Sequence, residues 1–508
     1  MLEPEKKYKS PLRKLVKFVE QSRDQWKDKY FQKKNQVKQL QNRMRYLERT
    51  KQEWKQKAQN LKAEIIALEK KTLSLEKVKK KTSRKINNLA DFEVVPFHHK
   101  YSVGHMMLFF SFVNSASSSL RGGVLSLEVV KNFFELSLDM PSWHSARLWL
   151  LRLGYYKLMR PKIQANDWIW IIDHTVQLGC EKNFVILGIR LGDLPKAGKC
   201  IKHKDIEPIT LSPVIQSNGE IVYQQLEESI EKTGVPKVIV ADHGSDLKSG
   251  IERFCKTHPE TRYIYDIKHK TANILKGELQ NEEAWVEFKS LASKTKNQLQ
   301  QTSLAHHGPP NQRAKARYMN VDKLVFWAYG QLKFLQSTEN KPEKLTEKLA
   351  WLWDYQEKIE EWNQLINEVT LVENWVKKQG LTQQSHSELS KQLEEKLPCH
   401  SNIRLKTVRT QLLDFVREQS SKAEERLLGI RCVIESVFGK QKRLEQDQSK
   451  SGFTGLVLGI AAIVSTTTSE IVKKAMETVP TKVVLNWCQE NIGSSVQAKK
   501  IEMREALK

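Results

Sequence analysis

The sequence predicts an α+β protein whose centre is a mixed α/β core interrupted by an all-helical insertion. Three observations carry this prediction: short runs of Ile, Val and Trp at 161–280, a helical pattern throughout 281–420, and a seven-residue apolar repeat within 1–90. At 508 residues the chain is also too long for one core, because single cores rarely exceed about 250–300 residues. We therefore expect several parts in series.

The composition indicates a polyanionic partner. Lys and Arg total 84 against 59 Asp and Glu, a net charge of +25, and such a balance favours nucleic acid or an anionic membrane. The longest apolar stretch, 456–464, is shorter than the about 20 residues of a membrane-spanning helix. No secretory signal is visible, and the six cysteines lack metal-ligand spacing. These features favour nucleic acid, no membrane, and a reducing cytoplasm.

Residues 1–90 are predicted to form a long basic helix that self-associates as a coiled coil. This segment holds 27 Lys and Arg and 10 Asp and Glu, so +17 of the charge lies there. An alternative is a solvated helix that packs on its own protein, and its basic face is a candidate for DNA contact. The heptad row consists of Leu12, Val19, Trp26, Lys33, Leu40, Leu47, Trp54, Leu61, Leu68 and Leu75.

Residues 91–160 outline a helix-turn-helix. A helical pattern at 124–136 is stopped by Asp-Met-Pro-Ser at 139–142, and Ser142 is placed to cap the next helix. If this second helix reads DNA, then His144 and Arg147 near its start face the major groove. The alternative is an ordinary helical hairpin that packs on the next domain.

Residues 161–280 are predicted to form the first part of the α/β core. Five strands are expected at 167–173, 183–192, 208–215, 236–242 and 262–267, with helices at 219–234 and 245–259. Three strands in series followed by helix–strand–helix–strand describe a mixed sheet covered by helices.

Two of these strands end in an acid, Asp173 after WIWII and Asp242 after VIVA. Carboxylates at the mouths of neighbouring strands repel each other unless a cation lies between them. Hard oxygen ligands suit Mg²⁺ or Mn²⁺, and two ions with a third acid would activate an attacking oxygen and stabilise a leaving one. Each Asp taken alone could instead be a turn or cap residue, and Asp246 is a fallback for Asp242.

Downstream of the core, the sequence predicts helices to its end. Residues 281–420 form the insertion, 421–465 the helix that carries Glu435 with the end of the core, and 466–508 a helical tail. The six tryptophans at 281–425 are expected to be mostly buried in the insertion's own core.

The segments DWIWIIDHTVQLG, KVIVADHGSDL and RCVIESVFGKQK, with a helical insertion before the last, resemble the DDE transposases of bacterial insertion sequences. These belong to the RNase H-like polynucleotidyl-transferase superfamily, and members with an insertion often carry Tyr-x2-Arg-x3-Glu-x6-Lys. Arg431, Glu435 and Lys442 keep this spacing, whereas Leu428 stands at the tyrosine position.

The resemblance implies an RNase H-like core in which Asp173, Asp242 and Glu435 are catalytic and hold the metal. Helical spacing would place Arg431 and Lys442 on one face with Glu435 as phosphate-binding cations, joined by Lys440. Two further residues are alternatives or supports near the metal: Asp266, expected within the fifth strand, and His269.

The implied function is DNA transposition: cleavage at transposon ends by metal-activated water, then joining of the 3′-hydroxyl to target DNA. The implied partners are double-stranded DNA and a second copy of the chain, and the implied location is the prokaryotic nucleoid. The alternative is a non-catalytic DNA-binding regulator derived from a transposase.

Overall fold

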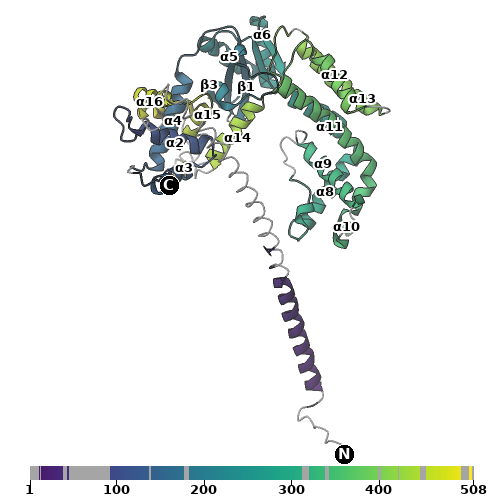
Figure 1. Cartoon of the computed structure of the whole chain (residues 1–508). Coiled ribbons are helices and arrows are strands. Elements are labelled where there is room, and N and C mark those ends of the chain that lie inside the picture. Colours follow the sequence, from purple (N-terminus) through teal and green to yellow (C-terminus); the bar gives the residue numbers. More distant parts are fainter. Residues whose placement is uncertain are drawn as a thin grey trace, which may run out of the picture. The chain divides into compact units, whose positions relative to one another are not determined.

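The computed structural model of the chain describes residues 11, 13–37, 40, 43–44, 92–136, 139–176, 182–311, 318, 320–337, 342–398, 402–421, 423–446, 454–492, 501 and 503–505. The chain divides into two compact units, Met1–Asn87 and Asn88–Lys508, which are drawn together in Figure 1.

The described part of the first unit is helical over residues 13–37. Its apolar row is exposed: Val19 is 61% exposed, Trp26 68% and Tyr30 61%. Burying such a stripe requires a partner surface, so self-association of this helix stays a prediction. The heptad residues Leu12, Leu47, Trp54, Leu61, Leu68 and Leu75 lie outside the described residues.

The second unit contains the five predicted strands in one mixed sheet of order β3-β2-β1-β4-β5. β1 pairs antiparallel with β2 and parallel with β4, so the first and fourth strands are neighbours. β2 pairs antiparallel with β3, and β4 pairs parallel with β5. The strands are β1 (Trp168–Val176), β2 (Lys182–Arg190), β3 (Glu207–Val214), β4 (Val238–Ala241) and β5 (Arg262–Tyr265).

Both faces of the sheet are buried, which explains the nearly continuous apolar runs in its strands. Trp170 and Ile172 of β1 belong to one core, whereas Ile169 and Ile171 belong to the other, as the alternation of side chains along a strand requires. The first core lies under α5 (Gly219–Thr233) and α6 (Ser245–Thr257). Helix α5 ends before Gly234, whose φ of 86° is costly for other residues.

The second core lies under helices from distant parts of the chain. Helix α14 packs on β1, and α4 and α15 pack on β3. These helices are α4 (Trp143–Met159), α14 (Cys432–Gln446) and α15 (Gly459–Ile463). The helix that carries Glu435 is thereby held against the strand that carries Asp173, although 262 residues separate the two acids in sequence.

The region 91–160 folds into α2 (Val103–Asn114), α3 (Leu120–Phe133) and α4, with Ser142 capping α4 as predicted. Helix α4 differs from the expected DNA-reading helix. It is buried along most of its length and packs on α2, α3, α15, α16 and β3. Apolar residues occur all round it, which is typical of a buried core helix. DNA reading by the exposed start of α4 stays a prediction beside the hairpin alternative.

The insertion forms helices whose apolar residues continue the second core, and among them Trp285 and Trp362 are 1% exposed. Trp353 is 40% exposed, and Trp327, expected to be buried, is half-buried and donates its Nε1 hydrogen bond to His307 O. The helices are α7 (Ile267–Leu279), α8 (Glu283–Leu299), α9 (Val321–Ser337), α10 (Glu343–Leu349), α11 (Gln356–Gln379), α12 (Ser385–Lys396) and α13 (Ile403–Ser420), with 3-10 turns Ala305–His307 and Ala350–Tyr355.

The C-terminal apolar stretch packs as core and lies on α4. It forms a 3-10 turn, η7 (Gly455–Leu458), followed by α15, and α16 (Ser469–Thr478) and α17 (Thr481–Ile492) complete the layer. No described helix has the length and apolarity needed to cross a membrane. A Cβ on Gly154 of α4 would lie 2.1 Å from Leu458 O, so the close approach of η7 requires glycine there.

We predict that Gly154→Ala lowers the free energy of unfolding by about 1–3 kcal/mol, because backbone in a packed core cannot move aside freely. The matched control is Gly277→Ala in α7, where nothing lies within 4 Å of the added Cβ. The control should be neutral or gain up to about 1 kcal/mol of helix stability. Urea unfolding of both variants measures the difference, and equal stabilities would contradict the packing of η7 on α4.

Candidate active site

Asp173 and Asp242 face the same side of the sheet. In the parallel pair of β1 and β4, Ile171 lies opposite Val240, and each acid follows two residues later. Asp242 directly follows β4 as predicted, whereas Asp173 lies within β1 and not at its end, because pairing with β2 continues the strand to Val176. Side chains two apart along a strand share a face. Ile171 and Val240 both belong to the core beneath α14, and both carboxylates point to that side.

The guanidinium of Arg431 lies among three carboxylates. Its Nη1 is 2.6 Å from Asp173 Oδ1, its Nη2 is 3.0 Å from Asp242 Oδ2, and its Nε is 3.2 Å from Asp266 Oδ2. The side chain is 4% exposed. This differs from the predicted phosphate-binding position on an exposed helix face. Helix α14 begins only at Cys432, so the i,i+4 spacing of a helix does not relate Arg431 to Glu435.

Asp266 joins the starts of two helices. Strand β5 ends at Tyr265, so Asp266 lies after the strand rather than within it as predicted. The Asp266 carboxylate caps α7 by accepting from Lys268 N, and it also accepts from Arg431 N just before α14. Asp266 is fully buried, and these bonds compensate for the lost hydration of its carboxylate.

Glu435 lies in the first turn of α14 beside two cationic or polar groups from the first turn of α7. Lys268 Nζ is 3.7 Å from Glu435 Oε2, and His269 Nε2 is 4.0 Å from Glu435 Oε1. The other ring nitrogen of His269, Nδ1, is 4.0 Å from Asp242 Oδ2. The imidazole therefore lies between Asp242 and Glu435 and links the strand-end acids to the helix acid.

The residues present fit a divalent metal ion. Asp266, His269 and Glu435 each offer a ligand atom, and these atoms all lie within 4.8 Å of one another. Carboxylate oxygens with an imidazole suit a hard or borderline divalent cation. This grouping differs from the predicted set of Asp173, Asp242 and Glu435. In the structure, Arg431 contacts both Asp173 and Asp242, and His269 lies between Arg431 and Glu435.

Burial removes hydration from the carboxylates of this cluster, so nearby positive charge becomes more important for their ionised forms. Loss of hydration raises the pKa of Asp173 to about 6 and that of Asp266 to about 7, although Arg431 opposes both shifts. Burial also disfavours the charged form of Arg431, but the three carboxylates hold its pKa above the usual range. Burial lowers the pKa of His269, which favours its neutral form. Four acids, counting Asp242 and Glu435, thus surround two cations, Arg431 and Lys268.

Asp246, the fallback for Asp242, belongs to a different network. Its Oδ2 lies 2.7 Å from Lys182 Nζ and 3.7 Å from His174 Nδ1. His174 follows Asp173 on β1 and therefore points to the opposite face of the sheet. The structure brings Asp246 to Lys182, and it brings Asp242 to Arg431.

The cations predicted to contact DNA lie in unlike surroundings. Lys442 on α14 and His144 at the start of α4 are exposed. Lys440 is half-buried and donates to Asn114 O at 2.7 Å. Arg147 is half-buried, and burial lowers its pKa. Of the residues predicted to contact DNA, Lys442 and His144 are therefore the ones whose side chains are accessible to a DNA phosphate.

Sequence reasoning missed the central place of Arg431 and the role of Lys268 beside Glu435. The sequence contains a signal for the burial of Arg431, because this residue lies between the apolar residues Ile430 and Val433. The signal for Lys268 was its place in the first turn after a strand-end acid, which brings it to the edge of the sheet where the other acids lie.

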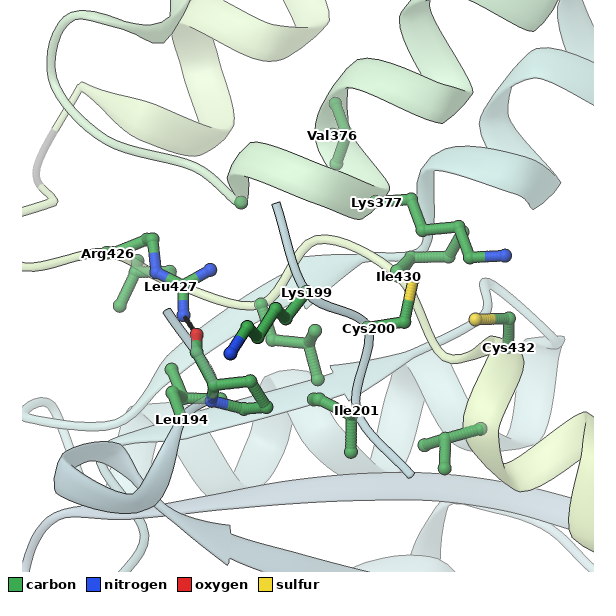
Figure 2. A pocket seen from close by; sticks show the side chains of 14 residues that line it. Leu194, Lys199, Cys200, Ile201, Val376, Lys377, Arg426, Leu427, Ile430 and Cys432 are labelled. Atoms are coloured by element: carbon green, nitrogen blue, oxygen red, sulfur yellow. Dashed lines mark hydrogen bonds between the residues drawn. The ribbon is translucent and has the colours of Figure 1, made fainter. Parts of the chain in front are cut away.

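A solvent-open pocket of about 460 Å³ adjoins the segment that carries Arg431. Figure 2 shows Ile430 and Cys432, the chain neighbours of Arg431, among its lining residues. The other walls come from the 194–201 loop and the end of α11, and the charged lining residues are all cationic: Lys199, Lys377 and Arg426.

Eleven chains of solved structures are similar to this chain. The chain is similar to a solved structure described as the Drosophila P element transposase strand transfer complex, with a TM-score of 0.35 and 10% sequence identity. The match covers 80% of this chain and 99% of that chain. No family model and no curated protein matches the sequence. A TM-score this low does not establish a shared fold, and the site is therefore interpreted from the geometry of this chain alone.

We predict that Asp246→Asn lowers the free energy of unfolding at pH 7 by about 1–2 kcal/mol. Burial opposes the ionised form of Asp246, but hydrogen bonds from Lys182 and Ser217 hold its pKa at about 2, below the ordinary 3.8. A depressed folded-state pKa gives stability that is present above pH 4 and lost as the pH falls towards 2. The difference between variant and wild type should therefore shrink between pH 7 and pH 3.

The control for this prediction is Asp193→Asn, which changes an exposed acid on the same domain. Chemical unfolding at several pH values measures both variants. A difference for Asp246→Asn that stays constant from pH 7 to pH 3 would contradict the ion pair with Lys182.

Proposed function

We propose that this chain is a metal-dependent DNA transposase with an RNase H-like core. The observation that carries the proposal is the convergence of four acids, Asp173, Asp242, Asp266 and Glu435, on a mostly buried cluster in which Arg431 and Lys268 are the cations paired with them among the described residues. Acids on or directly after neighbouring parallel strands, with another on a helix across the same face, form the arrangement that an RNase H-like sheet provides. The strand order β3-β2-β1-β4-β5 supports that proposal.

The proposed metal ligands are Asp173, Asp242 and Glu435, with Mg²⁺ or Mn²⁺ as the ion and two ions in the full site. This set differs from the Asp266, His269 and Glu435 grouping, and holding an ion with it requires Arg431 to give up its contacts with Asp173 and Asp242. When bound, two divalent ions would supply Lewis acidity to the attacking and leaving oxygens of a phosphodiester. Asp266 holds the first turns of α7 and α14 together through Lys268 N and Arg431 N. His269 stays between Asp242 and Glu435, where it can donate or accept one proton.

The substrate proposed is double-stranded DNA, first at transposon ends and then at a target. Water supplies the oxygen for cleavage and the freed 3′-hydroxyl supplies it for joining, so no covalent enzyme–DNA intermediate forms. Lys268, partly exposed beside Glu435, is placed to neutralise a phosphate that enters the site. The net charge of +25 supports DNA binding. Dimerisation through the exposed stripe of the N-terminal helix is part of the proposal.

A second candidate is a non-catalytic DNA-binding regulator derived from a transposase. One observation favours it: Arg431 pairs with both Asp173 and Asp242, so a cation of the chain itself compensates two of the proposed metal ligands. Both candidates predict salt-dependent DNA binding, because neutralised phosphates release counterions. Metal-dependent cleavage therefore separates them, and salt dependence does not.

We predict that the purified full chain nicks supercoiled plasmid with Mg²⁺ or Mn²⁺, and that Asp173→Asn lowers the rate by at least about 100-fold. The matched control, Asp193→Asn, removes an exposed carboxylate of the same domain and should nick like the wild type. Undiminished nicking by Asp173→Asn would refute the site. DNA binding without nicking in either metal would favour the regulator.

We predict that Lys442→Gln weakens binding to unrelated DNA sequences about equally and lowers the slope of log K against log salt by about 1. The reason is that Lys442 is exposed on α14 and available to a phosphate. Lys440→Gln is the comparison, because Lys440 bonds Asn114 O and should affect stability more than binding. Fluorescence anisotropy across salt concentrations measures both, and an unchanged slope for Lys442→Gln would place the DNA elsewhere.

A further inference from the structure

Arg431 contacts one carboxylate oxygen of each acid, Asp173 and Asp242, and so shares both groups with any cation that they would hold. Asp242 Oδ1 accepts from Gly244 N at 3.0 Å, and Asp242 Oδ2 is 3.0 Å from Arg431 Nη2. Asp173 Oδ1 accepts from His174 N at 2.8 Å and is 2.6 Å from Arg431 Nη1. A metal ion held by Asp173 and Asp242 would therefore lie close to the positive charge of the guanidinium, which already compensates both carboxylates.

Arg431 is held in this position by its backbone as well as by its charge. Arg431 N donates to Asp266 Oδ1, and two residues earlier Gly429 O accepts from Ile267 N at 3.1 Å. The Cβ of a larger residue at Gly429 would lie 2.6 Å from Val376 Cγ1, so the segment lies tightly against α11. The backbone contacts of this segment therefore hold the Arg431 side chain inside the cluster, where it is 4% exposed.

The contact with Asp266 differs from the other two. It uses Nε, nearest the aliphatic stem, at 3.2 Å from Asp266 Oδ2. A rotation about the last side-chain bonds could move Nη1 and Nη2 away from the strand ends while Nε keeps its carboxylate. Asp266 thus provides an anchor that remains when the two strand acids are released.

We propose that Arg431 is an internal counterion that competes with the divalent metal for Asp173 and Asp242. It is a positioning residue: it keeps the strand-end acids converged without metal, and metal loading requires its terminal nitrogens to withdraw while Nε stays with Asp266. Arg431 thereby sets the metal affinity of the site. The proposal rests on the metal-dependent function proposed for this chain.

The test measures Mn²⁺ binding to the full chain by electron paramagnetic resonance of free Mn²⁺. Arg431→Gln removes the positive charge of the guanidinium and should bind Mn²⁺ at least about tenfold more tightly. The reason is that a positive charge a few ångströms from a metal site repels the ion. The matched control is Lys256→Gln, which removes an exposed positive charge on α6 and should bind like the wild type. Equal or weaker Mn²⁺ binding by Arg431→Gln overturns the proposal.

A double variant shows whether the tighter Mn²⁺ binding of Arg431→Gln depends on Asp173. In Arg431→Gln combined with Asp173→Asn, the tighter binding should disappear, and a gain that persists overturns competition at Asp173. Failure of the two proposals is distinguishable. A wild type that neither binds Mn²⁺ nor nicks DNA refutes the proposed function and with it this inference, whereas a wild type that does both, with no gain in Arg431→Gln, refutes this inference alone.

Removing Arg431 leaves buried acids facing one another, so Arg431→Gln should have a lower Tm without metal. Mn²⁺ should then raise the Tm of Arg431→Gln by more than that of the wild type, and an equal rise contradicts the proposal. If Arg431→Gln does not fold, a crystal structure of the wild type with Mn²⁺ decides. Arg431 Nη1 out of hydrogen-bond reach of Asp173 Oδ1 supports the inference, and an unmoved guanidinium overturns it.

Discussion

The contact of one buried guanidinium with three carboxylates governs the arrangement of the second unit. Asp173 lies on β1, Asp242 and Asp266 directly follow its parallel neighbours β4 and β5, and all three acids contact Arg431. Three buried acids without a cation would repel one another at high cost in a low dielectric. The segment before α14 must therefore return to the sheet edge, and with it the helix that carries Glu435.

This requirement also explains how so long an insertion is accommodated. Asp266 and Arg431 are 165 residues apart in sequence, yet they lie in direct contact at the two ends of the insertion. Leu381 and Leu427 form a two-bond antiparallel bridge close to this junction. Because the entropy of closing a loop grows slowly with its length, helices α7–α13 can be inserted between two fixed points without displacing the acids.

The remaining helices act as a shell that fixes the face on which the acids lie. Helix α4 packs between the sheet and the C-terminal helices, and Lys157 at its end donates to Val464 O and Thr467 Oγ1 within that layer. Lys440 of α14 bonds Asn114 O of α2, so the same shell contacts the helix that carries Glu435. Helix α4 thus supports the core by packing, and residues at its start, such as His144, face solvent.

The sequence by itself determined the five strands, the helix caps at Ser142 and Gly234, and the place of Asp242 directly after β4, because periodicity, turn residues and side-chain alternation act locally. It did not determine the end of β1, which continues past Asp173 to Val176 in its pairing with β2. Only the tertiary structure decided what those acids meet. It placed Arg431 before α14, where helical spacing does not apply, moved Asp266 from a strand to a helix cap, and buried α4. Such contacts join residues up to 258 positions apart. The periodicity of a short segment does not show which distant charged side chain will pair with its buried acids.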